Sequence, residues 1–493
     1  MYEIVTFVCG LILPRLILSH FGSTYNGITS SVTQFLSLVS ILRLGVAGAT
    51  RVALYKTLAA GDTAGTSAIV RATEKYMRRI GYVILAYIVV LAVFYPMFTD
   101  TGVGYFDVAI LIVAAGIGTF AQYFFGITYQ TLLSADQSIY VYNISQTGCT
   151  VANTLLSAAL IYAGCTIQTV KLSSSIVFFL TPFILNLYVT KKYKLDKRCK
   201  PDNSGLKQRN DVLASSLANI VHENTDIVVL TLFCDVKIVS VYTIYNLVMA
   251  ALRKVLEIFS TGTEAIFGDM WAKKQYDSIR RNLSLYEYVI GVLVSILFSA
   301  TLMLIVPFVS LYTKGVNDVN YILPTYAVII SIAMACYCFR TPYLTLVQGV
   351  GHYKQTKRGA YFEAGLNLVS SVVLVQFIGI AGTAVGTLLA NVFRSLQYAF
   401  YIDDHIVGRG KLVIFKRILW ITLNIAASCG IAYLLLGTMA ESGWLKWILS
   451  GAIIVAIACA ITGISSALFF RDDMKKTLGV AKRMVTRSKG TQA

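Results

Sequence analysis

The sequence predicts an all-α, polytopic membrane protein with about fourteen transmembrane helices. Three observations carry this prediction. Of the 493 residues, 56% are hydrophobic and only 13% are charged, whereas about a quarter of a soluble domain is charged. Apolar stretches of bilayer length recur along the chain, and the basic residues gather in alternate connections between them. Together these features exclude a soluble enzyme.

The apolar stretches are long enough to cross a bilayer as helices, the conformation that satisfies its own backbone hydrogen bonds in hydrocarbon. The first stretch has neither a basic leading segment nor a small-residue cleavage site, so we expect a retained span. The expected helices cover residues 4–20, 26–52, 80–98, 105–133, 139–163, 167–190, 212–234, 238–266, 285–311, 321–347, 359–378, 380–402, 418–437 and 444–470.

The net charge of +18 follows the expected topology. With both termini placed in the cytoplasm, 31 of the 42 basic residues lie on the cytoplasmic side and 3 on the opposite side. This asymmetry obeys the positive-inside rule. Topology and anionic headgroups therefore account for the charge, and we expect no nucleic-acid partner.

A polar run at 191–211 separates six expected helices from eight. Landmarks recur across it at a nearly constant offset: Asn153 and Asn367 are 214 residues apart, and Gly45 and Gly262 are 217 apart. We therefore expect two pseudo-symmetric six-helix lobes in the same orientation, with a site between them. The predicted domains are an N-terminal lobe 1–190, a basic linker 191–211, a C-terminal lobe 212–402, and two extra helices with a basic cytoplasmic tail at 403–493.

Catalytic and metal motifs are missing from the sequence. The nine cysteines form no CxxC pair, and His222-Glu223 is not followed by the second histidine of an HExxH zinc site. The phosphate-binding GxxxxGK[ST] motif is also missing. We therefore expect no catalytic residue, no metal site and no enzymatic activity.

The segment 13–28 (LPRLILSHFGSTYNGI), the segment 42–48 (LRLGVAG) and the plan of six, six and two helices resemble one family. It is the multidrug, oligosaccharidyl-lipid and polysaccharide exporter superfamily, in its bacterial polysaccharide-flippase branch. The resemblance implies a flippase of the bacterial inner membrane that moves an undecaprenyl-pyrophosphate-linked oligosaccharide from the inner to the outer leaflet by alternating access. It implies export of capsule, O-antigen or exopolysaccharide, with membrane lipid, the lipid-linked glycan and the polysaccharide assembly machinery as partners.

Eight basic residues fall in or near the expected spans: Arg15, Arg43, Arg51, Lys171, Arg253, Lys254, Arg340 and Arg394. A central Arg or Lys costs about 2.5–3.5 kcal/mol on insertion, so such residues normally face a wet cavity or a partner. Guanidinium groups suit a pyrophosphate. Arg51 and Lys171 lie close enough to helix ends to snorkel to the headgroups.

Four arginines are the predicted substrate-binding residues. Arg43 and Arg253 occupy matching central positions in the second helix of each lobe. Arg15 directly follows Pro14, which bends its helix, and Arg340 precedes Thr341-Pro342 in a similar setting. Arg253 is four residues from Glu257, which equally allows an internal ion pair.

Glu223 and Asp226 are three apart on one expected helix and share a face. They are the predicted ion-coupling residues, for Na⁺ or H⁺, and the alternative is a polar contact between helices. No other cofactor is expected.

Two other functions compete. A cation-coupled multidrug antiporter of the same superfamily would present negative charge to cationic drugs, which the basic excess opposes. A membrane glycosyltransferase or polymerase usually needs a large domain to hold sugars, and the expected outside loops, of about four to twelve residues, are too short for one.

Overall fold

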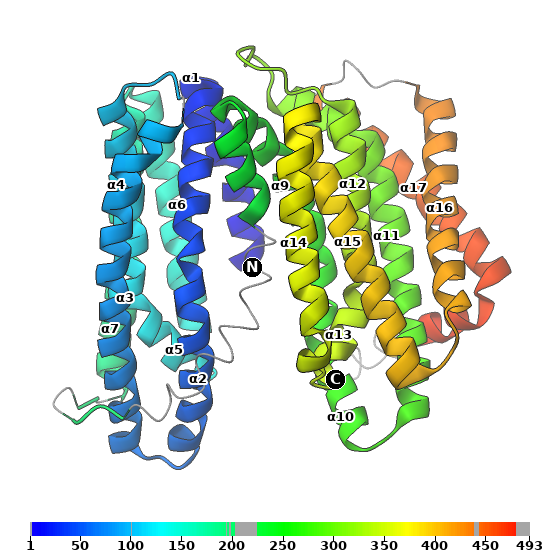
Figure 1. The fold of residues 1–493 in the computed structure, drawn as a ribbon, viewed down its shortest axis with the longest axis horizontal. Helices are drawn as coiled ribbons and strands as arrows, with labels where there is room; N and C mark the ends of the chain where they lie inside the picture. Colours follow the sequence, from blue (N-terminus) through cyan, green and yellow to red (C-terminus); the bar gives the residue numbers. More distant parts are fainter. Residues whose placement is uncertain are drawn as a thin grey trace, which may run out of the picture. The chain divides into compact units, whose positions relative to one another are not determined.

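The computed structural model describes residues 2–99, 101–193, 195–196, 199–202, 224–437 and 443–479, without the side chains of 41, 42, 44, 45 and 261. Over these ranges the chain is helical and has no strand (Figure 1). Ten of the described helices are long and apolar enough to cross a membrane. The predicted all-α, multi-pass fold is confirmed. Most of the predicted linker and residues 480–493 of the predicted tail lie outside the described residues.

The chain divides into two compact units. Unit 1 comprises Met1–Thr243 together with Gly315–Val319, and unit 2 comprises Ile244–Lys314 together with Asn320–Ala493. The boundary between them falls inside helix α9 (Val236–Glu257). The boundaries predicted from the sequence stay a prediction.

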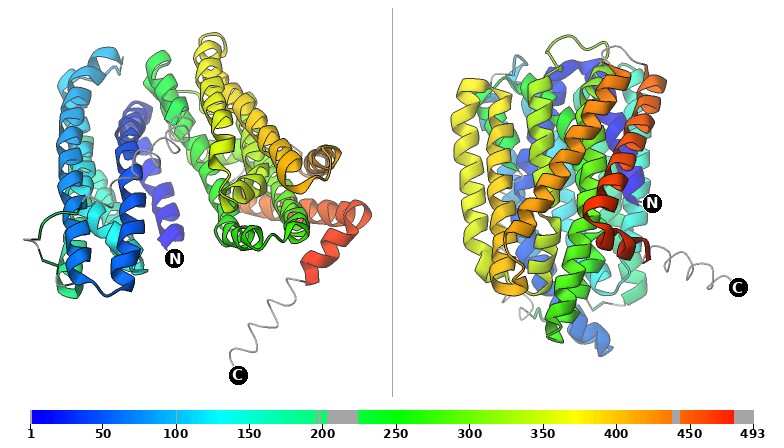
Figure 2. Two further views of the ribbon diagram at one scale, coloured as in Figure 1. Left: turned by 60° about the horizontal axis from the view of Figure 1, so that its bottom comes forward. Right: turned by 90° about the vertical axis from the view of Figure 1, so that its right-hand side faces the viewer.

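Unit 1 is a helix bundle in which α3 packs on α4 and α1 packs on α6; its blue and cyan helices stand next to one another in the left view of Figure 2. Its core is built from aliphatic side chains such as Ile28, Ile84 and Ile112, each fully buried. Its helices are α1 (Tyr2–Leu38), α2 (Ser40–Ala59), α3 (Thr63–Phe98), α4 (Tyr105–Ala121), α5 (Ile127–Ala135), α6 (Tyr140–Tyr162), α7 (Ile167–Tyr193), the short helix Asn224–Phe233 and the first part of α9.

Unit 2 is also a bundle, whose core is richer in aromatic side chains, including the buried Phe298, Tyr343 and Trp420. After the last part of α9, its helices are α10 (Ser260–Ala272), α11 (Tyr276–Tyr312), α12 (Pro324–Phe339), α13 (Thr341–Gly349), α14 (Tyr353–Ile378), α15 (Ile380–Ile402), α16 (Leu412–Leu436) and α17 (Trp444–Phe469).

The two asparagines that are 214 residues apart each lie within a helix of their unit. Asn153 on α6 and Asn367 on α14 are both buried. Each belongs to a helical hairpin, α6–α7 or α14–α15, whose helices also meet through polar side chains. In unit 2, the Asn367 amide donates to the Thr387 hydroxyl at 3.0 Å. A buried polar pair of this kind fixes the register of two apolar helices because an unpaired partner would be costly.

Several expected spans are interrupted. Residues 26–52 divide between α1 and α2 at Val39, residues 238–266 divide between α9 and α10, and residues 321–347 divide at Arg340. Residues 122–126 form a π-helical turn between α4 and α5. The sequence predicts each of these segments as one continuous span, because every break falls within a mainly apolar stretch.

Helix α1 is broken at Gly22, which adopts φ 79° and ψ −179°. Glycine takes such a backbone at little steric cost. The helix resumes at Ser23, whose backbone N–H donates to the Asp318 carboxylate at 2.8 Å, and the Ser23 hydroxyl donates to the same carboxylate. Asp318 therefore acts as an N-cap from a distant part of the chain, where an anion also complements the helix dipole.

The second half of α1 lies very close to α9. A Cβ added to Gly27 would lie 2.0 Å from the Val236 carbonyl oxygen, so no larger residue fits there without a shift. The neighbouring Asn26 amide donates to the Ser240 hydroxyl at 2.7 Å. A small residue with a polar neighbour is the usual means of close helix packing in membranes.

Helices α11 and α16 and the segment that follows α17 are joined in unit 2 by an ionic network. Glu287 on α11 accepts two hydrogen bonds from the Arg409 guanidinium group, at 2.6 and 2.9 Å, and forms an ion pair of 3.0 Å with Arg417. Arg417 also donates to Asp473 at 3.1 Å. The Glu287 side chain is only 1% exposed. The sequence placed Arg417 in a loop, but α16 begins at Leu412 and includes it.

We expect Gly27→Ala to lower the melting temperature of the detergent-solubilised chain, because the added methyl group would collide with backbone. Overpacking of this kind costs about 1–3 kcal/mol. Intrinsic fluorescence during heating would measure the change. Gly10→Ala is the matched control on the same helix, where nothing lies within 4 Å of an added Cβ. Equal melting of the two variants would contradict the close approach of α1 and α9.

We expect Glu287→Gln to destabilise the chain by about 3–5 kcal/mol, the usual effect of removing one partner from a buried ion pair. The substitution keeps the shape of the side chain but leaves Arg409 and Arg417 without their shared carboxylate. Asp269→Asn is the control, since Asp269 pairs with Lys273 at the surface with both side chains about 60% exposed. That variant should stay within about 1 kcal/mol of the intact chain. Comparable losses in the two variants would refute a special role for Glu287.

Candidate functional site

Two predicted substrate-binding arginines meet in unit 2. The guanidinium carbons of Arg253, near the end of α9, and Arg340, between α12 and α13, lie 4.8 and 4.2 Å from the ring centroid of Tyr337. At these distances each cation is attracted to the electron-rich ring. A single aromatic side chain thus holds two guanidinium groups near each other.

Arg340 is held from its other side by Glu363 on α14, with which it forms a buried ion pair. Glu363 also pairs with Arg394 of α15 at 3.2 Å. Arg394 in turn donates to the Tyr398 hydroxyl at 2.6 Å and to the Thr356 carbonyl at 3.0 Å. One carboxylate therefore pairs with two buried guanidinium groups. We call this group of side chains the arginine cluster; it consists of Arg253, Tyr337, Arg340, Glu363 and Arg394. The arginine cluster carries excess positive charge.

Arg253 is the accessible member of this arginine cluster. It donates to Glu257 at 2.6 Å, which is the ion pair that the spacing of four residues allowed. Its side chain is 31% exposed, compared with 9% for Arg340 and 4% for Arg394. The guanidinium groups of Arg340 and Arg394 are thus occupied by internal contacts, whereas part of the Arg253 guanidinium group is accessible to an anion.

The remaining predicted residues belong to unit 1. Arg15 lies partly buried on α1 after Pro14, and Arg43 lies partly buried on α2. Asp226 is 7% exposed, and the Tyr242 hydroxyl is 3.4 Å from its carboxylate. Glu223 lies outside the described residues. Substrate binding by Arg15 and Arg43 and ion coupling by Asp226 stay predictions.

Within the described ranges, no group of three or more His, Cys, Asp or Glu side chains is arranged to hold a metal ion. Helix Asn224–Phe233 also makes polar contacts through an amide. The Asn224 carbonyl oxygen accepts from the Gln34 amide and, at 2.8 Å, from the Ser37 hydroxyl.

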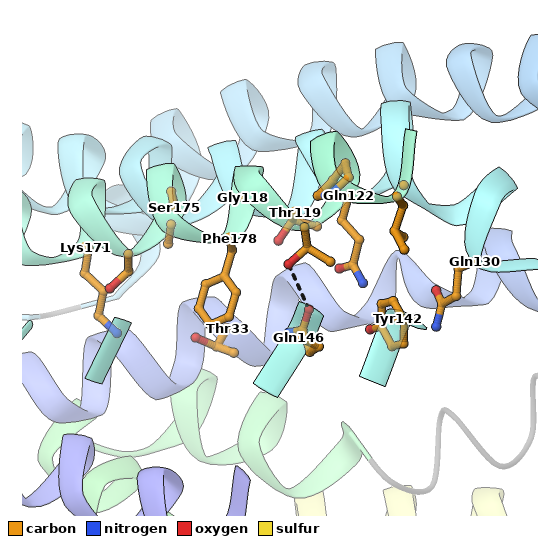
Figure 3. A pocket seen from close by; sticks show the side chains of 16 residues that line it. Thr33, Gly118, Thr119, Gln122, Gln130, Tyr142, Gln146, Lys171, Ser175 and Phe178 are labelled. Atoms are coloured by element: carbon orange, nitrogen blue, oxygen red, sulfur yellow. Dashed lines mark hydrogen bonds between the residues drawn. The ribbon is translucent and has the colours of Figure 1, made fainter. Parts of the chain in front are cut away.

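Unit 1 contains a polar cavity of about 300 Å³ between α1, α4, α5, α6 and α7 (Figure 3). Figure 3 shows Lys171 at one end of the row of side chains and Gln130 with Tyr142 at the other. Among the residues that the structure describes, no carboxylate lines the cavity. The lining residues are Thr33, Ala115, Gly118, Thr119, Gln122, Gly126, Gln130, Tyr142, Gln146, Lys171, Ser174, Ser175, Phe178, Thr181, Pro182 and Leu185.

The shape of this unit 1 cavity results from local departures from regular α-helix. Pro182 inside α7 lacks the N–H that would bond to the preceding turn, and Gln122 and Gly126 belong to the π-helical turn. Gly118 and Gly126 both face α7 closely. A Cβ added to Gly118 would lie 3.2 Å from the Ser175 side chain, and a Cβ added to Gly126 would lie 3.2 Å from the Pro182 side chain. The two glycines bring α4 and α7 together beside the cavity, and π-helical turns are frequent at functional sites.

Lys171 has a different environment from the one that its position suggested. It lies near the start of α7, where the sequence indicated snorkelling to the headgroups, yet its side chain lines the polar cavity. Across the described part of the chain, no side chain pairs with its ammonium group. An ammonium on a wall of amides and hydroxyls is a binding feature that the hydropathy of α7 does not reveal.

Three charged residues that form buried ion pairs were not recognised from the sequence. Arg394 was counted among the basic residues but was not nominated, although it shares Glu363 with Arg340. Glu287 and Arg417 lie near the ends of expected spans and were not recognised as buried partners. An acidic residue two positions inside the expected helix 285–311 was the available signal for Glu287.

No family model and no curated protein sequence matches the chain. Solved structures do match it. The lipid II flippase MurJ in an inward closed conformation gives a TM-score of 0.72 at 13% identity, over 96% of this chain and 99% of that one. An inward-facing multidrug resistance transporter of the MATE family gives 0.68 at 14% identity, over 81% and 94%.

A third match is a transporter from Pyrococcus furiosus, with a TM-score of 0.52 at 14% identity over 81% of this chain and 95% of that one. It is described as having a binding pocket of reverse polarity that suggests a different function. At these identities the likeness establishes the fold. The chain therefore has the fold of the multidrug, oligosaccharidyl-lipid and polysaccharide exporter superfamily, as its sequence predicted.

Proposed function

We propose that this protein is a flippase that moves an undecaprenyl-pyrophosphate-linked oligosaccharide from the inner to the outer leaflet of the bacterial cytoplasmic membrane. Alternating access of the two lobes would carry the headgroup across, for export of a surface polysaccharide. No bond is made or broken in this process. The distribution of basic residues supports a topology with both termini in the cytoplasm.

The observation that carries this proposal is the arginine cluster of unit 2. Arg253, Arg340 and Arg394 are balanced within it by one buried glutamate, while Glu257 at its edge is 47% exposed. A diphosphate is the ligand that matches such a group, because each guanidinium can donate two parallel hydrogen bonds to phosphate oxygens. Arg253 is the member with the exposure needed to make that contact.

A multidrug antiporter is the competing function, since the fold is shared with multidrug transporters. A cationic drug needs carboxylates or an excess of aromatic faces. The polar cavity of unit 1 is lined by one lysine and no carboxylate among the described residues. The observed charge therefore favours an anionic substrate over a cationic one.

Ion coupling through Asp226, with Na⁺ or H⁺, is part of the proposal. Asp226 is buried and lies near a tyrosine hydroxyl, an oxygen-rich setting in which a carboxylate can take up either ion. If transport proves independent of Na⁺ and of a proton gradient, ion coupling through Asp226 is refuted, whereas the proposed flippase function is unaffected.

The proposal is tested by following a fluorescent undecaprenyl-pyrophosphate disaccharide across the bilayer of proteoliposomes that contain the purified chain. We expect the intact chain to move this lipid. Arg253→Ala should slow the movement about tenfold, the effect of losing one charge-assisted contact of roughly 1.5 kcal/mol. Arg253→Lys should recover part of the rate, because it keeps the charge but loses the fork.

Lys254→Ala is the matched control, one residue along the same helix and exposed, and it should leave the rate nearly unchanged. Arg340→Ala is unsuitable as the first variant, because it would also remove one of the two buried partners of Glu363. Uptake of a cationic dye together with no lipid movement would replace the flippase with the antiporter.

A further inference from the structure

The polar cavity of unit 1 is separate from the arginine cluster and has its own chemistry. Along α7 it extends from Lys171 to Leu185, which corresponds to about 21 Å at the rise of an α-helix. Its volume of about 300 Å³ is therefore drawn out along the helix. An extended ligand fits such a shape better than a compact one.

The lining of this cavity suits a ligand with many hydroxyl groups. Gln122, Gln130 and Gln146 each carry an amide that both donates and accepts hydrogen bonds, as a sugar hydroxyl does. The Gln146 carbonyl oxygen already accepts from the Thr181 hydroxyl at 3.2 Å, which orients its amide. Gln122 and Gln130 make no side-chain hydrogen bond within the described residues, so their amides are available to a ligand.

Lys171 adds a single positive charge at one end of this row (Figure 3). Its ammonium has no carboxylate partner in the described ranges, and the cavity wall offers it only hydroxyls and amides. Lys171 thus presents a positive charge to a cavity whose described lining supplies no counter-charge, and an anionic group of a ligand would supply it. The complementary group is an anion attached to a hydroxyl-rich body.

We propose that the cavity of unit 1 binds an acidic sugar, with Lys171 holding its carboxylate and the three glutamines contacting the hydroxyls of the glycan. The inference deepens the proposed flippase function and rests on it: the site would make transport selective for a glycan that carries an acidic residue. The carboxylate of the glycan, rather than a phosphate of the lipid carrier, is the group assigned to Lys171.

The binding test uses a free disaccharide of glucuronic acid and glucose together with its carboxyl-reduced, neutral form. Calorimetric titration of the full chain in detergent should show tighter binding of the acidic disaccharide. Lys171→Met should weaken that binding about tenfold, through loss of a charge-assisted contact, and should leave binding of the neutral form unchanged. Lys191→Met is the matched control, because Lys191 lies exposed on the same helix outside the cavity.

A second variant guards against a misfolded Lys171→Met protein. Gln130→Leu lies at the opposite end of the cavity and should weaken both disaccharides to a similar degree, because it removes hydrogen bonds to hydroxyls rather than to the acid. Equal binding of the acidic form by Lys171→Met and the intact chain overturns the proposal. Undetectable binding of either disaccharide to the intact chain also overturns it.

The two possible sources of the anion are separated in proteoliposomes, with undecaprenyl-pyrophosphate carrying either the acidic or the neutral disaccharide. The proposal requires Lys171→Met to slow only the acidic lipid. Equal slowing of both lipids would assign Lys171 to the pyrophosphate and overturn the proposal. If neither lipid moves, the flippase function fails, while binding of the free acidic disaccharide through Lys171 still decides the nature of the cavity.

Discussion

A guanidinium group buried among apolar helices must meet a carboxylate, and in unit 2 two glutamates satisfy this requirement for four arginines. Glu363 serves Arg340 and Arg394, and Glu287 serves Arg409 and Arg417. Each glutamate thereby joins separate segments of the chain, because its carboxylate forms an ion pair with an arginine from each of two segments. The arrangement of α11, α14, α15 and α16 depends on these two carboxylates.

The positions of the helices followed from the sequence because hydrocarbon demands continuous apolar stretches and self-satisfied backbone. The interruptions did not follow. The break at Gly22 is stabilised by Asp318, which is 295 residues away in sequence, and the π-helical turn at 122–126 contains no residue that forbids a regular helix. Both depend on contacts between segments, which a hydropathy profile of one segment cannot represent.

The candidate site was predictable only in part. The high insertion cost of a central arginine nominated Arg253 and Arg340, but their meeting at Tyr337 depends on how α9 packs against α12. Lys171 was assigned to the headgroups because depth along a helix does not specify the direction of a side chain. The sequence therefore identifies the charged residues, whereas the partner and the orientation of each side chain depend on how the helices pack.

The cap on α1 has a consequence for biosynthesis. Unit 1 is discontinuous in sequence, because Gly315–Val319 belongs to it and Asp318 caps the helix that resumes at Ser23. A ribosome that adds about 5–20 residues per second needs roughly 15–60 seconds to travel from one partner to the other. During that interval the nascent first helix lacks its cap, so the amino-terminal bundle reaches its final form only after α11 and the loop that follows it have been synthesised.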